Sequence, residues 1–209
     1  MKINNVQYIT QDHPQLSHAD QALAMFRLGV KWVQLRMKEA SEDDIIAAAK
    51  QILIYAEQEG GTLILNDSVA LAKALGVKAV HLGLNDMPID KAREVLGPEV
   101  IIGGTANTFE QVQLQVARGA DYVGVGPFRF TTTKKNLSPT LGLKGYQSLL
   151  QQMKDAAIDL PLFCVGGITM NDVDDLRSIG IRHFAISGDL LDIVLTGNKD
   201  KIGALSEYL

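Results

Sequence analysis

Residues 62–82 read TLILNDSVALAKALGVKAVHL and contain the unit on which the whole sequence is built. Two short apolar runs, Thr62–Asn66 and Ala79–Leu82, have the length and composition of buried strands. The segment between them is helical in pattern and stops at Leu75–Gly76, where a glycine readily ends a helix. This stretch therefore predicts a strand, a helix and a second strand.

The same alternation extends from this unit to both ends of the chain. A helix is clearest where Ile45, Ala49 and Ile52 form one apolar stripe, with Ser41 as the predicted N-cap. Repeated strand–helix units imply parallel strands joined by right-handed crossovers. The six further predicted strands are Gln7–Ile9, Trp32–Arg36, Val100–Gly103, Tyr122–Gly126, Leu162–Val165 and His183–Ile186.

Eight such units in about 200 to 250 residues favour an α/β fold of the closed (β/α)8 type, a TIM barrel. An open doubly wound sheet is the structural alternative. No linker or shift of composition divides the 209 residues, so 1–209 is expected to be one TIM-barrel catalytic domain. The least regular piece, 128–139, follows the sixth strand and is a candidate lid.

The composition excludes several classes of protein. The formal net charge is -4, so the chain has no basic field of the kind that holds nucleic acid or an anionic membrane. The only cysteine, Cys164, lies in an apolar run, which indicates a buried thiol in a reducing compartment. No stretch of ~18 apolar residues and no export signal occurs, so a cytoplasmic location is expected.

Polar residues collect at the predicted carboxyl ends of the strands, where active sites of such barrels form. Asp67 and Asp86 follow neighbouring strands, and together they could share a Mg²⁺ whose other ligands are waters and substrate phosphate. The alternative is purely structural. Asp67 could cap the helix from Ser68, and Asp86 could open the turn before Pro88.

Cationic and hydroxyl side chains also lie near strand ends. Arg36 offers a planar fork for phosphate, and Lys38 offers a mobile point charge. The 128–139 loop adds further groups of these kinds, namely Arg129, Thr131, Thr132, Thr133, Lys134 and Lys135. Cationic side chains on the surface and threonines in loops often bind no ligand. Their joint placement around a metal site nevertheless favours phosphate binding.

The seventh and eighth strands end in a second candidate phosphate site. Gly166–Gly167 lacks side chains, which lets backbone N–H groups approach an anion, and Ile186–Ser187 follows the next strand. Two glycines also occur in ordinary tight turns.

The sequence leaves two roles open for His81, a hydrogen bond in the core or proton transfer. His13, His18 and His183 are isolated, and the absence of a Ser/His/Asp arrangement disfavours hydrolysis.

These motifs together resemble the thiamine phosphate synthase family along essentially the whole chain. The matching segments, in order, are Gln34–Lys38 (Q-L-R-x-K), Asn66–Asp67, His81–Asp86 (H-L-G-x-x-D), Gly126–Pro127 with Thr131–Lys134 (T-x-T-K), Gly166–Ile168, and Ile186–Ser187. The resemblance implies a transferase that joins a pyrimidine diphosphate to a thiazole phosphate, with Mg²⁺ as cofactor. The sequence leaves the oligomeric state open, with a homodimer as one candidate.

The resemblance also implies roles for individual residues. It assigns the pyrimidine diphosphate to Gln34, Arg36, Lys38, Asn66, Thr105 and Lys134. It assigns the thiazole phosphate to Thr131, Thr133, Gly167, Ile186 and Ser187. Asp67 and Asp86 would hold Mg²⁺, while Arg36, Lys38 and Lys134 would neutralise the departing diphosphate as catalytic residues.

The chain departs from the family pattern at several positions. It has Ser68, Leu84 and Thr105 where the family commonly has Arg, Gln and Ser, and 128–130 lacks the usual proline. Ala106–Asn107 stands where relatives usually show histidine. A related thiazole tautomerase branch relies on a histidine in this segment, so a tautomerase is the rival enzyme. A catalytically silent barrel that binds thiamine phosphates as a regulator is the rival from another class.

Overall fold

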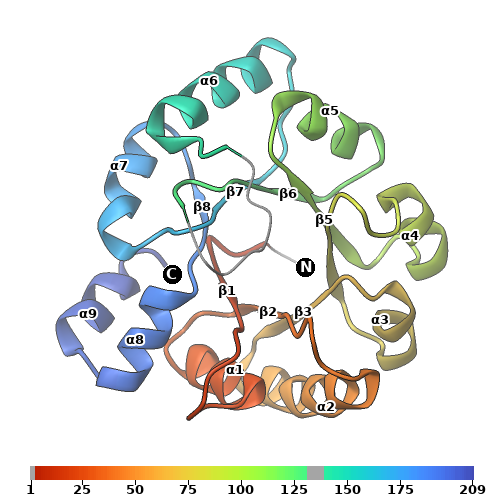
Figure 1. Cartoon of the computed structure of the whole chain (residues 1–209), viewed down its shortest axis with the longest axis vertical. Coiled ribbons are helices and arrows are strands. Elements are labelled where there is room, and N and C mark those ends of the chain that lie inside the picture. The colour runs from red at the N-terminus through yellow and green to blue at the C-terminus, as the bar shows by residue number, and fades with distance from the viewer. Residues whose placement is uncertain (1–2, 131–138) are drawn as a thin grey trace.

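A computed structural model of the chain describes residues 3–130 and 139–209, which form a closed barrel of eight strands (Figure 1). All neighbouring strands are parallel, and β1 pairs with β8 to close the ring. Closure confirms the predicted TIM barrel and excludes the open sheet. The strands are β1 Val6–Ile9, β2 Trp32–Leu35, β3 Thr62–Asn66, β4 Ala79–Leu82, β5 Ile101–Ala106, β6 Tyr122–Val125, β7 Leu162–Val165 and β8 His183–Ala185.

Helices surround the barrel on the outside (Figure 1). They are α1 His18–Arg27, α2 Glu42–Glu59, α3 Val69–Leu75, α4 Ile89–Leu96, α5 Phe109–Ala117, α6 Gly142–Asp155, α7 Val173–Ser178, α8 Gly188–Thr196 and α9 Lys199–Ser206, with a short 3₁₀ turn η1 at Met170–Asp172. The predicted N-cap Ser41 is confirmed, because its hydroxyl accepts the Asp44 N–H at 3.2 Å. Gly76 ends α3 as predicted, and Gly60 ends α2 in the same way, both in the left-handed conformation.

The predicted strands are confirmed, and most of their ends differ by one residue or none. The exception is β5, which was predicted to end at Gly103 and continues to Ala106. The extension pairs with β6, where Thr105 lies beside Gly124 and Ala106 beside Val125. Thr105 is therefore held by the sheet ladder rather than by a loop.

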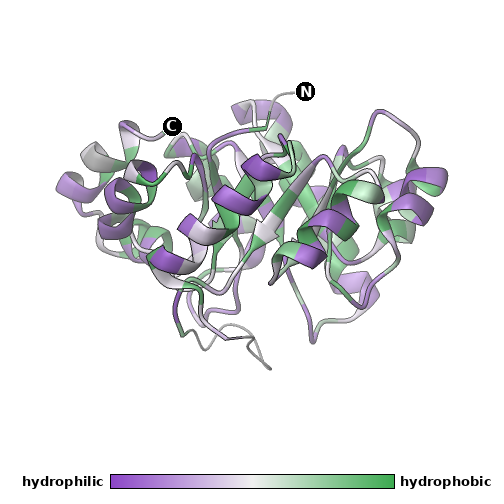
Figure 2. Cartoon of the chain, turned by 90° about the horizontal axis from the view of Figure 1, so that it is seen from above, coloured by the Kyte–Doolittle hydropathy of each residue, from purple (hydrophilic) through white to green (hydrophobic). Residues whose placement is uncertain are grey.

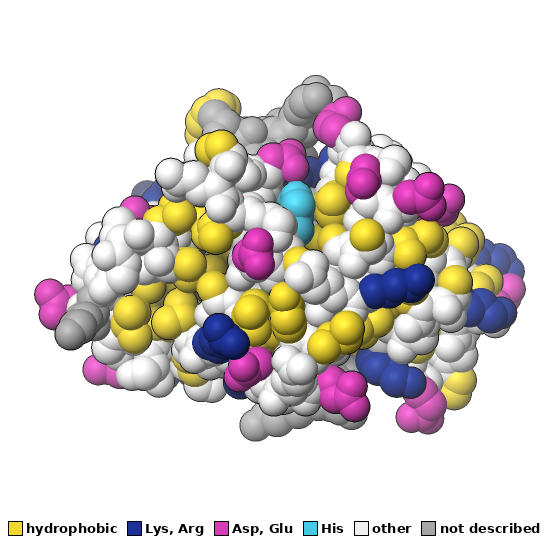
Figure 3. All heavy atoms as spheres, turned by 90° about the horizontal axis from the view of Figure 1, so that it is seen from below, with side chains coloured by type: hydrophobic (Ala, Val, Ile, Leu, Met, Phe, Trp, Pro, Cys, Tyr) yellow, Lys and Arg dark blue, Asp and Glu magenta, His cyan; other side chains and the backbone are white. Residues whose placement is uncertain are grey.

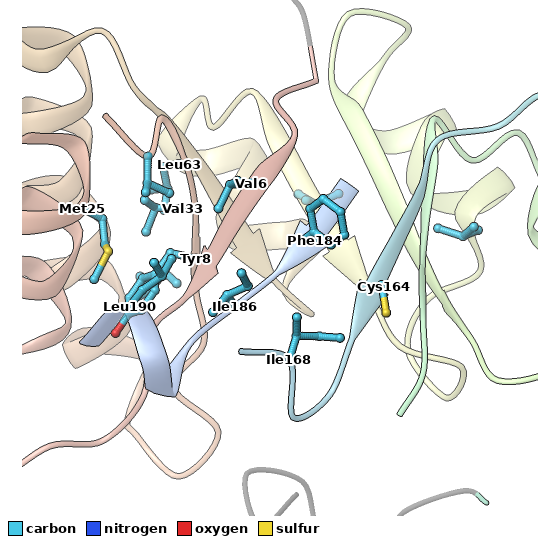
Figure 4. Close-up of a cluster of buried hydrophobic side chains, with 14 of the residues drawn as sticks. Val6, Tyr8, Met25, Val33, Leu63, Cys164, Ile168, Phe184, Ile186 and Leu190 are labelled. Carbon is cyan, nitrogen blue, oxygen red and sulfur yellow. The ribbon is translucent and has the colours of Figure 1, made fainter. Parts of the chain in front are cut away.

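Two apolar layers follow from the alternation of side chains along each strand. Outward residues such as Val33, Leu63 and Phe184 pack toward the helices, in the same buried cluster as Met25 of α1 and Leu190 of α8 (Figure 4). Inward residues fill the barrel in a separate cluster of Trp32, Ile64, Ala79, Ile101, Tyr122 and Phe163. Side chains therefore fill the barrel interior, and an active site can form only at the mouth, where the carboxyl ends of the strands meet.

One glycine makes room for this interior plug. A Cβ on Gly103 would lie 2.0 Å from Cζ of Tyr122, far inside contact distance. Tyr122 is fully buried and lies edge-on to Phe163 with ring centroids 5.2 Å apart. The absence of a side chain at Gly103 is therefore what lets the Tyr122 ring occupy the barrel interior.

The surface follows the expected polarity. Figure 2 shows hydrophilic residues on the outer sides of the helices and hydrophobic residues toward the strands. On the face shown in Figure 3, acidic and basic side chains are interspersed and form no continuous basic surface. Within residues 3–130 and 139–209, every helix is too short or too polar to cross a membrane. Cys164 is buried as predicted, and burial raises the pKa of its thiol to about 12.

Candidate active site

The carboxyl ends of β2, β3 and β4 bring a lysine and two carboxylates together. Lys38, three residues beyond β2, forms an ion pair with Oδ2 of Asp67, which directly follows β3. Asp86, from the loop after β4, is close enough to Asp67 to raise the pKa of its carboxyl. The cluster predicted from strand order is therefore present in the structure.

Asp67 does not cap the following helix. Ser68 is the N-cap of α3, and its hydroxyl accepts the Leu71 N–H at 3.3 Å. The backbone of Asp67 instead takes a left-handed conformation, with φ of 65°, while its N–H donates to the His81 carbonyl at 2.9 Å. Such a backbone is costly for a residue other than glycine and is typical of functional sites.

The surroundings of Asp67 disfavour its ionised form. Burial raises the pKa of Asp67, the neighbouring Asp86 raises it further, and Lys38 acts in the opposite direction without prevailing. Two carboxylates this close repel unless a proton or a metal lies between them. The ionised pair is therefore disfavoured in the protein alone.

Asp86 has a structural role as well. Its Oδ2 accepts the Gly83 N–H at 2.6 Å, so it closes the turn at 83–86, directly after β4. Among the residues described, no cluster of three or more His, Cys, Asp or Glu side chains could hold a metal. A cation bound by Asp67 and Asp86 would keep open positions for water and phosphate oxygens, which suits Mg²⁺.

His81 lies in a hydrogen-bonded chain inside the barrel mouth. Its Nδ1 is 3.1 Å from the Tyr122 hydroxyl, and its Nε2 is 3.0 Å from Oγ1 of Thr105. Burial raises the pKa of Tyr122, so its hydroxyl keeps its proton and can donate to Nδ1. With that tautomer, Nε2–H donates to Oγ1 of Thr105. The core hydrogen bond expected for His81 is confirmed.

Sequence reasoning missed a second histidine contact. His18 is not isolated, because its Nδ1 is 2.7 Å from Oγ1 of Thr10 and its Nε2 is 3.1 Å from Asp12. This arrangement has the order hydroxyl, imidazole, carboxylate. Thr10 is buried, however, and its oxygen also accepts the Arg36 N–H at 3.1 Å. The trio is therefore suited to fixing the backbone of Arg36 rather than to nucleophilic attack.

The opposite side of the mouth is formed by the turns after β7 and β8. Gly166 and Gly167 both have positive φ, at 91° and 75°. Ile186 has its side chain buried beside Tyr8 and Leu190, so only its backbone can face a ligand (Figure 4). Ser187 follows it directly and precedes α8.

The Arg129 side chain is not available as an extra phosphate cation. Its guanidinium pairs with both carboxylate oxygens of Asp172, one of them at 2.9 Å, and donates to the Gly167 carbonyl at 3.1 Å. The sequence had grouped Arg129 with the phosphate-binding cations, and the pairing corrects this. Thr131, Thr133 and Lys134, together with Thr132 and Lys135, lie outside the described residues.

Asp172 is expected to stabilise the fold above about pH 4 and to lose this contribution in acid. Burial works to raise its pKa, but hydrogen bonds from Arg129 and Thr169 outweigh burial and hold the pKa below its ordinary value. A depressed folded-state pKa gives stability that is present above the unfolded-state pKa and lost as the pH falls through the folded-state value.

Urea unfolding of the wild type and of Asp172→Asn, from about pH 6 down to about pH 2.5, measures this. The difference between the two free energies of unfolding should shrink toward low pH. A difference that stays constant over the whole range would contradict the assignment.

Comparison with known proteins agrees with the geometry. A family model described as thiamine monophosphate synthase matches residues 6–190. The chain belongs to this family. It is therefore an enzyme, a transferase of the thiamine-phosphate synthase kind.

Individual relatives are similar over most of their length. The thiamine-phosphate synthase of Bacteroides thetaiotaomicron is 50% identical over 187 residues, which cover 90% of this chain and 90% of the relative. That of Flavobacterium johnsoniae is 46% identical over 188 residues, covering 88% and 87%. The thiamine phosphate pyrophosphorylase of Pyrococcus furiosus superposes with a TM-score of 0.78 at 23% identity, covering 98% and 93%, and supports the fold.

Proposed function

We propose that this enzyme joins 4-amino-2-methyl-5-hydroxymethylpyrimidine diphosphate to 4-methyl-5-(2-hydroxyethyl)thiazole phosphate, giving thiamine phosphate and diphosphate. The observation that carries the proposal is the placement of Asp67, Asp86 and Lys38 at one edge of the barrel mouth. That edge suits a diphosphate. The turn at Gly166–Gly167, directly after β7, suits the single phosphate of the second substrate.

The pyrimidine diphosphate would lie over β2 to β5. Gln34, Asn66 and Thr105 stand at or near the carboxyl ends of their strands and would bind the polar groups of this substrate. Arg36 and Lys38, with Lys134 from outside the described residues, would bind the diphosphate. Mg²⁺, when bound by Asp67 and Asp86, would neutralise charge on the departing diphosphate.

The thiazole phosphate would be held at its phosphate end by Gly167, Ile186 and Ser187, with Thr131 and Thr133 from outside the described residues. In a dissociative substitution, the bond from the pyrimidine methylene carbon to the diphosphate oxygen breaks first, and the thiazole nitrogen then attacks the carbocation-like carbon. The bonding electrons leave with the diphosphate. No protein nucleophile is needed, so the chain's contribution is positioning and electrostatic stabilisation by Arg36, Lys38 and Lys134.

One observation weighs against the tautomerase. At the segment where that branch relies on a histidine, Asn107 is committed to structure, because its side chain donates to the Gly126 carbonyl. Its N–H also donates to Oε1 of Gln111 at 2.7 Å. A tautomerase, moreover, would have no use for paired carboxylates beside a cation. The cytoplasmic location and the homodimer stay predictions.

Diphosphate release should require both substrates and Mg²⁺. The test uses purified protein with each of the three components omitted in turn, and follows diphosphate by a coupled assay. Release in the complete mixture alone supports the synthase. Saturable binding of the thiazole phosphate without any release would overturn the proposal in favour of the tautomerase or the regulator.

A further inference from the structure

Three consecutive carbonyls, from the last residue of β7 onward, all accept hydrogen bonds from the segment that follows β6. The Val165 carbonyl accepts the Phe128 N–H at 2.9 Å, and the Gly166 carbonyl accepts the Arg129 N–H at 3.1 Å. The Gly167 carbonyl accepts from the Arg129 guanidinium at 3.1 Å. The main chain and the side chain of Arg129 therefore fix two successive peptide units of the glycine turn.

Fixing these carbonyls also fixes the N–H groups on their far sides. In a planar trans peptide the C=O of one residue and the N–H of the next point in opposite directions. The N–H groups of Gly167 and Ile168 therefore point away from Arg129, and neither donates to another residue of the described chain. The next two amides are occupied, since Thr169 donates to Asp172 at 2.8 Å and Met170 to Asp189 at 2.7 Å.

Arg129 is itself held in place. Asp172, whose side chain is only 14% exposed, accepts from both terminal nitrogens of the guanidinium. The guanidinium also lies 4.8 Å from the centroid of the Phe128 ring. A Cβ on Gly167 would come within 2.5 Å of Cγ of Arg129, so the arginine and the glycine fit only as a pair.

We propose that Arg129 is a positioning residue that holds the Gly167 and Ile168 N–H groups in place to bind the phosphate of the thiazole substrate. This inference rests on the proposed function. Arg129 acts through the turn and does not bind phosphate directly, because its guanidinium is already used by Asp172 and Gly167. The planar fork of arginine is required, since a lysine ammonium cannot bond the carbonyl and both carboxylate oxygens in this geometry.

The first variant is Arg129→Met, studied in the full chain. Its affinity for thiazole phosphate and for inorganic phosphate, by titration calorimetry, should fall by about tenfold or more. Affinity for the dephosphorylated thiazole alcohol and the KM for the pyrimidine diphosphate should change by less than about twofold. An equal loss for the thiazole alcohol, or unchanged phosphate affinity, would overturn the inference.

Arg93→Met is the matched control. Arg93 wraps a turn at the other end of the barrel, where it donates to the carbonyls of Gly97 and Val100 and pairs with Asp121. Residues at that end serve stability rather than chemistry. This variant should melt at a lower temperature than the wild type and keep its phosphate affinity. If it lost phosphate affinity as Arg129→Met does, general destabilisation would explain both, and the inference would fail.

Arg129→Lys separates positioning from charge. If Arg129 positions the turn, Arg129→Lys should bind phosphate little better than Arg129→Met. Adding Asp172→Asn to Arg129→Met should lower the phosphate affinity little further. Full recovery by lysine would show direct charge and overturn the inference. ¹⁵N spectra of the wild type separate this inference from the proposed function. Phosphate should shift the Gly167 and Ile168 amide signals even if the enzyme releases no diphosphate. Unshifted amides at saturation would sink the inference alone.

Discussion

Asp67→Asn is expected to lower the rate of diphosphate release by a factor on the order of 10² to 10³ without unfolding the protein. Asparagine keeps the shape of the side chain and tolerates the left-handed backbone, with φ of 65°, that Asp67 adopts. The substitution removes the negative charge that would bind Mg²⁺. Alanine would be a poorer test, because it would add backbone strain to the loss of charge.

Thermal melting with and without Mg²⁺ checks this independently of turnover. Mg²⁺ should raise the melting temperature of the wild type, because a ligand that binds only the folded state stabilises it, and should do so far less in Asp67→Asn. Without Mg²⁺ the variant should melt no lower than the wild type. The reason is that the surroundings of Asp67 in the wild type raise its pKa and so disfavour the ionised carboxylate, which asparagine lacks.

Asp43→Asn is the matched control, since Asp43 is an exposed carboxylate in the first turn of α2. It should leave both the rate and the response to Mg²⁺ unchanged. If Asp67→Asn kept wild-type diphosphate release, Asp67 could not be a ligand of a required metal.

Gly103→Ala is expected to destabilise the fold by about 3 kcal/mol or more, at the upper end of the usual cost of overpacking. The new Cβ would overlap the ring of Tyr122, which is fully buried and bonded through its hydroxyl to His81. The ring cannot move outward without breaking the packing of the barrel interior. Urea unfolding measures the loss.

Two further variants make this prediction specific. Adding Tyr122→Leu to Gly103→Ala should recover part of the lost stability, because the shorter side chain vacates the space that the methyl group needs. Gly203→Ala, within α9, meets nothing within 4 Å and should stabilise by about 0.5 to 1 kcal/mol. A Gly103→Ala protein as stable as Gly203→Ala would show that the interior adapts, contrary to this account.

Much of the candidate site could be predicted because it follows from strand order. The carboxyl ends of consecutive parallel strands meet at one edge, so Asp67 after β3 had to lie near Asp86 after β4. Sequence could not decide whether Asp67 caps the following helix. The structure of 67–68 answers this. Ser68 is the N-cap of α3, and the Asp67 side chain instead lies beside Lys38 and Asp86.

The contacts of His18 and Arg129 could not be predicted at all. His18 meets Thr10 and Asp12 because the end of β1 turns back over the start of α1. Arg129 meets Asp172, which is 43 residues further along the chain, because their loops lie on adjacent strands of the ring. No local pattern of residue types marks either contact.

The sequence by itself determined the order of strands and helices, because apolar periodicity and the glycines that end helices act over a few residues. It also favoured a closed barrel of parallel strands, and the pairing of β1 with β8 in the structure excluded the open sheet. Only the tertiary structure decided the length of β5, the conformation of Asp67 and the partner of Arg129. These depend on register, on close packing and on contacts between loops, which exist only once the barrel has closed.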